Sequence, residues 1–446
     1  MSARPSDVRR ALVLAAGRGS RLDHETPKPL FPVLGVPLLA RTLFTLEKAG
    51  ITEAWVVVGY QGEEVRRGIE AIERLDLRVH WIHNDRWDEA NGVSVLAAEP
   101  ELDGPFVLTM ADHVFDAAAV ERLREGAGGL EGVDLVVDRE IEAVNDLDDA
   151  TKVRLRGDRI VEIGKALDDF DVIDTGVFLA SPELFQALRD AGEAPSLSDG
   201  VRALAGKGRA RAVDGSGITW QDVDTPDDVD AAERKLLAQW PKETDGPVSK
   251  RINRPVSTRI TRRIAGTGIT PNQVSVATLL VSLVGAGLAA VGGYLAWLGT
   301  GVLVQLASIL DGVDGEVAIL THRASRRGEW VDTVCDNVSY VAFLVGLSVG
   351  VWRAEMHPVY VWGGVVGVVA ATLSIANIKL YLLRRKDSGS ARAVEYGYEA
   401  GDGAFARLLQ FAHYLGKRDV FSFLFLVLAV AGQLPLALPM VGAGAG

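Results

Sequence analysis

The pattern of apolar and polar residues divides the chain into two unlike halves. Up to about Trp240, short apolar runs alternate with longer amphipathic segments. Short apolar runs between turns are typical of buried strands, and apolar residues at helical spacing predict helices. The predicted strands are 10–16, 54–58, 78–82 and 105–110, and the predicted helices are 37–49, 63–74 and 226–237. This alternation predicts an α/β, Rossmann-like domain built on a parallel sheet.

The second half is far more apolar and predicts an all-α polytopic membrane domain. No charged residue stands between Val274 and Leu310, a stretch that suits two membrane spans with a turn near Gly292–Gly293 or at 299–301. Spans are also predicted at 331–352 and 358–383, a fifth begins at 420–430, and 435–446 would be a short sixth. We therefore expect about six transmembrane helices.

A polar segment containing proline and glycine, residues 241–250, is typical of a linker between these halves. The next stretch, 251–263, holds five arginines and predicts either a basic juxtamembrane helix or a topology signal alone. The predicted domains are thus 1–240, a linker and juxtamembrane helix at 241–265, and a membrane domain at 266–446. Basic residues also cluster in 321–327 and 384–392, so the positive-inside rule places the N-terminal domain and this side of the membrane domain in the cytoplasm.

Composition narrows the classes of function. The formal net charge of −12 over 446 residues argues against a nucleic-acid-binding protein. The single cysteine, Cys335, excludes a disulfide framework and a cysteine zinc cluster. Residues 1–10 are polar, so no signal peptide is expected.

Four aspartates stand at helical spacings where apolar stretches end and begin. Asp311 and Asp314 are three residues apart, and Asp332 and Asp336 are four apart, so each pair lies on one face of a helix. Acids at the ends of membrane spans are costly unless they are paired, hydrated or metal-bound. The four together would make an all-oxygen site suited to Mg²⁺ or Mn²⁺. The alternative is four interfacial acids, each solvated at a helix end.

The surrounding residues resemble the signature of the CDP-alcohol phosphatidyltransferase family. That signature runs Asp-x-x-Asp-Gly-x-x-Ala-Arg and then Gly-x-x-x-Asp-x-x-x-Asp, and this chain departs from it only at Ile319, where the family usually has Arg. The resemblance implies that the first three aspartates hold metal and that Gly315 lets the pyrophosphate of a CDP-alcohol approach. It also implies that Asp336 accepts the proton of the acceptor hydroxyl. Arg323, Arg326 or Arg327 would then supply the cation missing at Ile319.

The first predicted strand runs into a glycine-rich turn, where backbone N–H groups can approach phosphates closely. The stretch from Leu14 to Leu22, followed by Thr26-Pro27-Lys28-Pro29-Leu30, resembles the N-terminal signature of the sugar-phosphate nucleotidyltransferases. By that resemblance Ala15, Ala16, Gly17, Gly19 and Arg21 surround the triphosphate of CTP, and Lys28 bridges its phosphates. A solvated loop lysine is the alternative for Lys28, although the two flanking prolines favour a positioned cation.

The same resemblance suggests further site residues. It places Mg²⁺ on Asp112 and Asp222, with Asp224 as the fallback for the second ligand; helix capping is the alternative role for Asp112 and Asp224. It places Asn84 and Ser94 near the base and ribose. It also makes Lys152 and Lys165 candidates for holding the phosphate of the acceptor, or ordinary surface lysines.

The fusion of these two halves resembles the family of bifunctional inositol-1-phosphate cytidylyltransferase/di-myo-inositol-phosphate-phosphate synthases. This implies that CTP and inositol 1-phosphate give CDP-inositol, which reacts with a second inositol 1-phosphate to give a phosphorylated diester and CMP. The enzyme would lie in the cell membrane with both active sites facing the cytoplasm, and a homodimer through the membrane domain is compatible with this. Two alternatives are a phospholipid synthase acting on another CDP-alcohol, and a membrane enzyme with a non-catalytic regulatory N-terminal domain.

Overall fold

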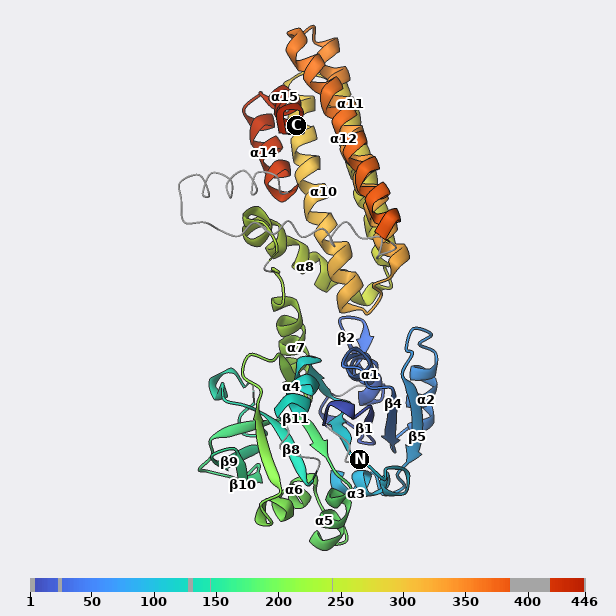
Figure 1. The fold of residues 1–446 in the computed structure, drawn as a ribbon, viewed down its shortest axis with the longest axis vertical. Coiled ribbons are helices and arrows are strands. Elements are labelled where there is room, and N and C mark those ends of the chain that lie inside the picture. Colours follow the sequence, from blue (N-terminus) through green and yellow to red (C-terminus); the bar gives the residue numbers. More distant parts are fainter. Residues whose placement is uncertain are drawn as a thin grey trace. The chain divides into compact units, whose positions relative to one another are not determined.

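The computed structural model describes residues 5–22, 26–126, 131–144, 146–242, 244–385 and 418–444. Contacts divide it into two compact units, Met1–Leu236 and Leu237–Gly446. We call these the N-terminal unit and the membrane unit and describe each by itself (Figure 1).

The N-terminal unit is built on a mixed sheet with the strand order β5-β4-β1-β6-β11-β8-β12-β10-β9 among the described residues. The strands are β1 (Arg10–Ala15), β4 (Glu53–Val58), β5 (Arg78–His83), β6 (Phe106–Met110), β8 (Val133–Asp138), β9 (Lys152–Arg156), β10 (Arg159–Gly164), β11 (Val172–Ala180) and β12 (Ala210–Asp214). All four predicted strands are present, and β5, β4, β1 and β6 are parallel. The predicted parallel arrangement is therefore confirmed for these strands, but the whole sheet is mixed, because β11 runs antiparallel to both β6 and β8.

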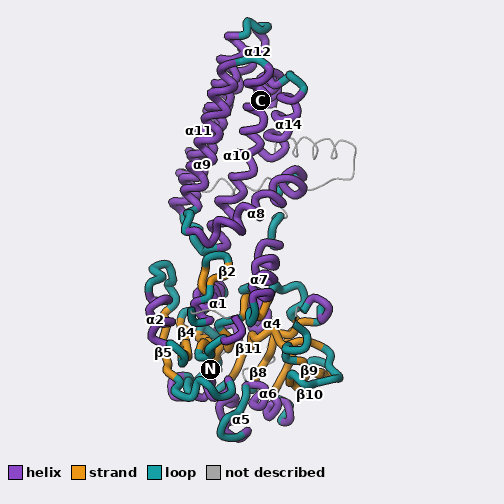
Figure 2. Tube along the Cα trace, turned by 180° about the vertical axis from the view of Figure 1, so that it is seen from behind, coloured by secondary structure: helices purple, strands orange, loops and turns teal. Residues whose placement is uncertain are grey.

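Helices cover both faces of this sheet, because successive residues of a strand point to opposite faces. In β1, Ala11 and Val13 belong to one buried cluster, and Leu12 and Leu14 belong to another. The first cluster is covered by α1 (Leu38–Lys48), α2 (Gly62–Glu70) and α4 (Ala118–Gly126), and the second by α3 (Asn91–Leu96), α5 (Glu183–Ala191) and α6 (Leu197–Gly206). The strands of this unit appear in orange in Figure 2.

Two short elements outside the main sheet position the chemistry of this unit. The strand β7 (His113–Phe115) follows β6 and pairs antiparallel with β13 (Trp220–Asp222), which sets His113 opposite Asp222. The chain then enters α7 (Pro226–Ala238). A ladder between residues this far apart in sequence brings two acidic segments to one edge of the sheet.

The described part of the membrane unit is entirely helical (Figure 2). Its α-helices are α8 (Arg254–Ile264), α9 (Pro271–Val291), α10 (Tyr294–Leu320), α11 (Arg326–Arg353), α12 (Pro358–Arg385), α14 (Arg418–Val430) and α15 (Ala437–Gly444). The predicted break at Gly292–Gly293 is confirmed, since both glycines have positive φ and separate α9 from α10. Among the described residues, α9, α10 and α11 are long and apolar enough to cross a membrane. Most of the predicted basic cluster at 384–392 lies outside the described residues.

Helix α11 carries exposed tryptophans near its two ends. Trp330 is 62% exposed and Trp352 is 68% exposed. At 1.5 Å per residue they stand about 33 Å apart along the helix, close to the thickness of a bilayer's hydrocarbon core. Tryptophan is enriched at both membrane–water interfaces, so this spacing agrees with a helix that crosses the bilayer.

Helices α9 and α11 approach closely because α11 has glycine where the two backbones meet. A Cβ atom at Gly346 would overlap the carbonyl oxygen of Ala286, and one at Gly350 would overlap that of Ala289. Small residues at four-residue spacing allow such contact between helices in membranes. The pair therefore fixes the scaffold from which α10 and α11 present their aspartates.

Replacing Gly346 by leucine should lower the stability of the membrane unit by about 1–3 kcal/mol, because the side chain must force the two backbones apart. Thermal unfolding of the purified protein in detergent measures the change. Gly287→Leu on α9 is the matched control, since a Cβ there meets no atom within 4 Å. Equal melting temperatures for the two variants would contradict this account of the packing.

Candidate active sites

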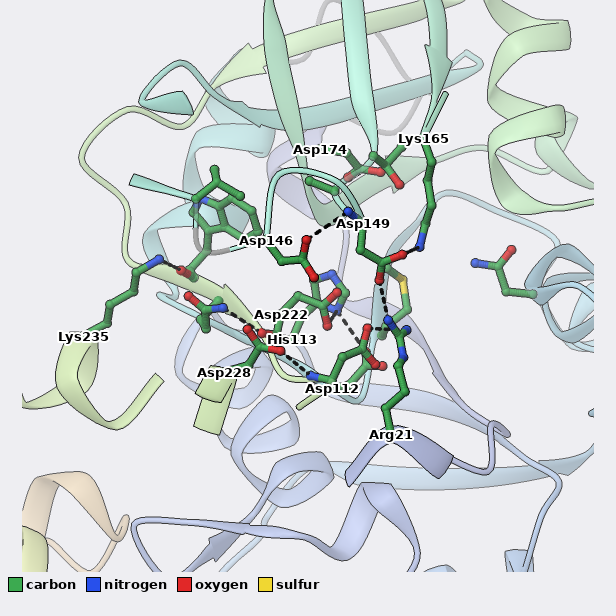
Figure 3. A pocket seen from close by; sticks show the side chains of 18 residues that line it. Arg21, Asp112, His113, Asp146, Asp149, Lys165, Asp174, Asp222, Asp228 and Lys235 are labelled. Carbon is green, nitrogen blue, oxygen red and sulfur yellow. Dashed lines mark hydrogen bonds and ion pairs between the residues drawn. The ribbon is translucent and has the colours of Figure 1, made fainter. Parts of the chain in front are cut away.

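The N-terminal unit has a polar cavity of about 290 Å³ at the carboxyl ends of β1 and β6, where ligands of such sheets usually sit. Ten of its lining residues are labelled in Figure 3, where the carboxylates of Asp112, Asp149 and Asp222 lie near Arg21 and His113. The lining comes from segments that are far apart in the sequence and that the sheet brings to one edge.

Two cations neutralise the acids at this cavity. The ammonium of Lys28 lies 2.5 Å from Asp112 Oδ2 and 2.5 Å from Asp224 Oδ1, and its side chain is only 9% exposed. Arg21 donates to Asp149 Oδ2 and to Asp224 Oδ2, each at 2.6 Å. Burial by itself lowers the pKa of Lys28, but the surrounding carboxylates outweigh burial and raise the pKa above its ordinary value. Lys28 is therefore a buried, charged lysine and not a solvated one.

Asp112, His113 and Asp222 form a cluster in which one potential ligand atom of each lies within 4.8 Å of the others. His113 Nδ1 is 2.9 Å from Asp112 Oδ1 and 3.9 Å from Asp222 Oδ1. Burial by itself lowers the pKa of His113, but the nearby carboxylates of Asp222 and Asp112 outweigh burial and raise the pKa to about 9. Burial raises the pKa of Asp222 to about 6; the nearby His113 opposes this rise, and the neighbouring Asp112 and Asp224 add to it.

Asp222 therefore has the features of a ligand for a cation. Its Oδ1 atom is buried and makes no hydrogen bond among the described residues. Asp224, the fallback, already contacts both Lys28 and Arg21. The donor set thus fits a divalent metal held by Asp112 and Asp222, with His113 as a neighbour.

Glycine is required where the loop after β1 passes Lys28. Gly19 has a φ of 64°, and a Cβ there would overlap the side chain of Lys28. Gly17 has no atom within 4 Å of a Cβ position, which leaves its backbone open to a ligand. Both findings agree with a loop that brings N–H groups to phosphates.

The other predicted residues of this unit lie around the cavity in different ways. Lys165 lines it and donates to Asp149 Oδ1 at 2.6 Å. Lys152 is not among the lining residues; its ammonium donates to the carbonyl of Lys165 and lies over the ring of Phe170. Lys165 is therefore the better placed of the two for an acceptor phosphate.

Asn84 and Ser94 also lie outside the lining and hydrogen-bond each other at 3.0 Å, whereas Asn91, on the same helix as Ser94, does line the cavity. Ala15 and Ala16 are buried at the end of β1, and the carbonyl of Ala16 accepts from the N–H of Tyr60. None of these four residues lines the cavity.

In the membrane unit, α10 and α11 bring three aspartates together as their spacing predicts. One carboxylate oxygen each of Asp311, Asp314 and Asp332 lies within 4.8 Å of the others. Asp314 is 6% exposed and accepts a hydrogen bond of 2.6 Å from Ser275 Oγ on α9. Three carboxylates this close need a cation, and an all-oxygen set of this kind fits Mg²⁺ or Mn²⁺.

The fourth aspartate is joined to this cluster through an arginine that the sequence analysis did not single out. Arg418, the first residue of α14, contacts Asp336 and lies 2.9 Å from Asp311 Oδ1. The signal was present in the sequence, since Arg418 is a charged residue at the head of an apolar helix. Only the fold shows that it reaches the aspartates.

A cavity of about 410 Å³ adjoins this cluster and includes Asp311, Gly315 and Ile319. Gly315 has no atom within 4 Å of a Cβ position, so a ligand could approach its backbone. The expectation that Arg323, Arg326 or Arg327 would replace the missing arginine is wrong for this cavity. Among the described residues that line it, the cations are Lys242, Arg254 and Arg418.

Comparisons with known proteins agree with this division into two sites. Residues 11–207 match the family described as MobA-like NTP transferase domain, and residues 268–434 match the family described as CDP-alcohol phosphatidyltransferase. The order of the two domains predicted from the motifs is therefore confirmed.

Proteins named as bifunctional enzymes are similar over most of the chain, and a solved structure is similar over about half of it. A protein of Rubrobacter xylanophilus named bifunctional IPC transferase and DIPP synthase is 43% identical over 345 residues, covering 76% of this chain and 77% of its own. A protein of Aquifex aeolicus with the same name is 32% identical over 430 residues, covering 95% and 92%. A solved structure of the inositol-1-phosphate CTP transferase from T. maritima is 23% identical with a TM-score of 0.47, covering 51% of this chain and 96% of that one.

The two acidic clusters should appear as two independent classes of metal site. In a titration of the full-length protein with Mn²⁺, followed by the electron paramagnetic resonance of the free ion, Asp222→Asn should remove one class and Asp314→Asn the other. Each loss should weaken affinity at that site at least tenfold, because one ligand of a small carboxylate set is neutralised. Asp103→Asn is the control, since the Asp103 side chain is 92% exposed and contacts only Arg10 among the described residues. Unchanged binding in both cluster variants would show that neither cluster holds the metal.

Proposed function

Because the chain belongs to the family of bifunctional IPC transferases and DIPP synthases, we propose that it makes CDP-inositol and then consumes it. The N-terminal unit would transfer CMP from CTP to inositol 1-phosphate and release pyrophosphate. The membrane unit would join CDP-inositol to a second inositol 1-phosphate, giving a phosphorylated diester and CMP. The observation that carries this proposal is that each unit has its own acidic centre beside a polar cavity.

In the N-terminal unit, a phosphate oxygen of inositol 1-phosphate would attack the α-phosphorus of CTP. A new phosphorus–oxygen bond forms while the bond to the pyrophosphate leaving group breaks. Arg21 and Lys28 are placed to neutralise charge that develops on the phosphates, and the loop around Gly17 offers N–H groups. Lys165 would hold the acceptor's phosphate. Mg²⁺ held by Asp112 and Asp222 would neutralise further phosphate charge.

In the membrane unit, a hydroxyl of the second inositol 1-phosphate would attack the β-phosphorus of CDP-inositol. The proton of that hydroxyl passes to Asp336, and the phosphorus–oxygen bond to CMP breaks. Arg418 contacts Asp336 and Asp311. When metal binds the aspartates, the guanidinium of Arg418 could leave a carboxylate and bind a phosphate of the substrate instead. Mg²⁺ on Asp311, Asp314 and Asp332 would neutralise the pyrophosphate.

The proposal also includes the location of both sites. We place the membrane unit across the bilayer as a multi-pass domain, with the aspartates at the cytoplasmic side. The support is the apolar length of α9, α10 and α11 and the basic residues at 251–263 and 321–327. A homodimer through the membrane unit is compatible with this arrangement.

The two reactions should be separable by single substitutions. With CTP and labelled inositol 1-phosphate, the wild type should give a water-soluble phosphodiester in phosphorus NMR. Asp112→Asn should stop pyrophosphate release yet still convert supplied CDP-inositol, and Asp332→Asn should accumulate CDP-inositol. Phosphate label in the lipid phase would instead indicate a phospholipid synthase. Normal pyrophosphate release by Asp112→Asn would contradict the metal assignment.

Asp336→Asn should lower kcat of the membrane reaction by about 10²–10⁴-fold while leaving KM for CDP-inositol within about threefold, because a general base acts on chemistry more than on binding. Steady-state CMP release at saturating substrates measures both constants. Glu329→Gln is the control, since Glu329 is an exposed acid on the same helix. A variant that binds poorly but turns over at the wild-type rate would contradict the role of Asp336.

A further inference from the structure

The cavity of the membrane unit is lined in part by the segment that precedes α8. Residues 240–249, largely predicted as a linker, contribute Trp240, Lys242, Thr244, Asp245, Gly246 and Ser249 to the lining. A segment that only connected two domains would have no reason to line a cavity beside catalytic aspartates. We call the described residues of this segment, 240–242 and 244–249, the linker wall.

Trp240 fixes the start of the linker wall. It is 8% exposed, and two cations lie on its indole ring: the ammonium of Lys242 at 4.3 Å from the ring centre and the guanidinium of Arg254 at 4.4 Å. Cation–π contacts are strongest with tryptophan and when the groups are partly desolvated. The buried ring therefore ties the wall to α8.

Arg254 in turn ties the wall to α10. It donates to Asp245 through Nε at 2.7 Å and through Nη2 at 3.1 Å, and to Glu316 through Nη1 at 2.7 Å. Glu316 is fully buried directly after Gly315, and it also accepts hydrogen bonds of 2.6 Å from Ser257 and Thr261. A buried carboxylate with several donors holds a fixed geometry, because removing any partner leaves charge uncompensated.

The far end of the wall is fixed on α14. The N–H of Ser249 donates to Asp419 Oδ2 at 2.7 Å, and a Cβ at Gly246 would overlap the same carboxylate. Asp419 directly follows Arg418, which contacts Asp311 and Asp336. The wall is thus anchored at both ends to elements that carry the proposed catalytic groups.

The wall gives the cavity a lining suited to a charged, hydroxylated ligand. Its lining residues supply an ammonium, hydroxyl groups and a carboxylate, and the facing helices add Asn253, Ser257 and Ser308. An acyl chain would offer this polar lining no hydrogen bonds and would displace the water beside it, which costs free energy. A phosphorylated polyol offers both the hydroxyls and the anionic charge that this lining matches.

We propose that the linker wall is part of the acceptor site of the membrane unit, where it binds the phosphorylated polyol that attacks the CDP-alcohol. This rests on the proposed function of that unit. Lys242 serves the acceptor's phosphate, and the Trp240–Arg254–Glu316 contacts are positioning contacts that hold the wall in place. The segment therefore does more than tether one unit to the other.

Two matched insertions of Gly-Ser-Gly-Ser in the full-length protein test this. One lies between Gln239 and Trp240, outside the wall, and the other between Gly246 and Pro247, inside it. The membrane reaction is measured with supplied CDP-inositol and varied inositol 1-phosphate. The inner insertion should raise KM for the phosphorylated acceptor at least tenfold and leave KM for CDP-inositol within twofold. The outer insertion should change neither.

Point variants decide the case if the inner insertion prevents folding, as judged by loss of all CMP release. Lys242→Met and Trp240→Leu should each raise KM for the acceptor at least fivefold, whereas Lys250→Met, outside the lining, should not. Unchanged acceptor KM in the inner insertion or in both point variants overturns the proposal. An equal rise in both KM values also overturns it, because it would indicate general disruption.

Trypsin cleavage after Lys242 separates this inference from the proposed function. If the wild-type protein makes no product from any phosphorylated polyol, the proposed activity is refuted, and so is the proposed acceptor role of the linker wall. The anchored wall is still tested, because wild-type protein should be cut after Lys242 at least tenfold more slowly than Trp240→Leu protein. Equal cleavage rates would show that the segment is an unanchored linker.

Discussion

Several carboxylates converge in each unit, and like charges at such distances must be neutralised for the fold to form. In the N-terminal unit, Lys28 contacts Asp112 and Asp224, and Arg21 contacts Asp224. The two cations are far from these acids in the sequence. In the membrane unit, Arg418 bridges the two aspartate pairs, since it contacts Asp311 and Asp336. Under the proposed function, metal would bind the carboxylates and substrate phosphates would bind beside these cations. The same electrostatic demand would then favour metal and phosphorylated ligands.

The parts of this arrangement that depend on local sequence could be predicted. The short apolar run of β1 predicts a buried strand, and the spacing of Asp311 from Asp314 places both on one face of a helix. The glycine turn at Gly292–Gly293 was equally readable, because a positive φ favours glycine. Pairing between distant segments could not be read in this way. The antiparallel course of β11, and the ladder that sets His113 opposite Asp222, depend on which strands meet in the folded sheet.

The membrane unit also shows that the sequence does not predict contacts between distant segments. Ile319 stands where the family signature usually has arginine. Neighbouring arginines in the sequence were the natural substitutes, yet the cations that share the cavity with Ile319 come from the linker wall, α8 and α14. In the sequence, Arg254 is only one of five arginines that precede the first predicted span. Its partner Glu316 is a charged residue with no exposed surface, and nothing in a single sequence shows what satisfies such a group. Burial of a charge is explained only by its three-dimensional partners.

The two exposed tryptophans of α11 give a measure of depth. Asp332 is two residues from Trp330, and Asp336 is six, so the acids stand within about 9 Å of Trp330 along a helix that continues for about 24 Å more to Trp352, as judged from the rise per residue. In the arrangement proposed above, Trp330 lies at the cytoplasmic interface and the aspartates lie close to it, far from the opposite surface of the bilayer. Water-soluble substrates could then enter and leave without partitioning into lipid. In that arrangement the long apolar remainder of α9, α10 and α11 would anchor the unit, so the thickness of the bilayer could vary with little change in the distance of the aspartates from the cytoplasmic interface.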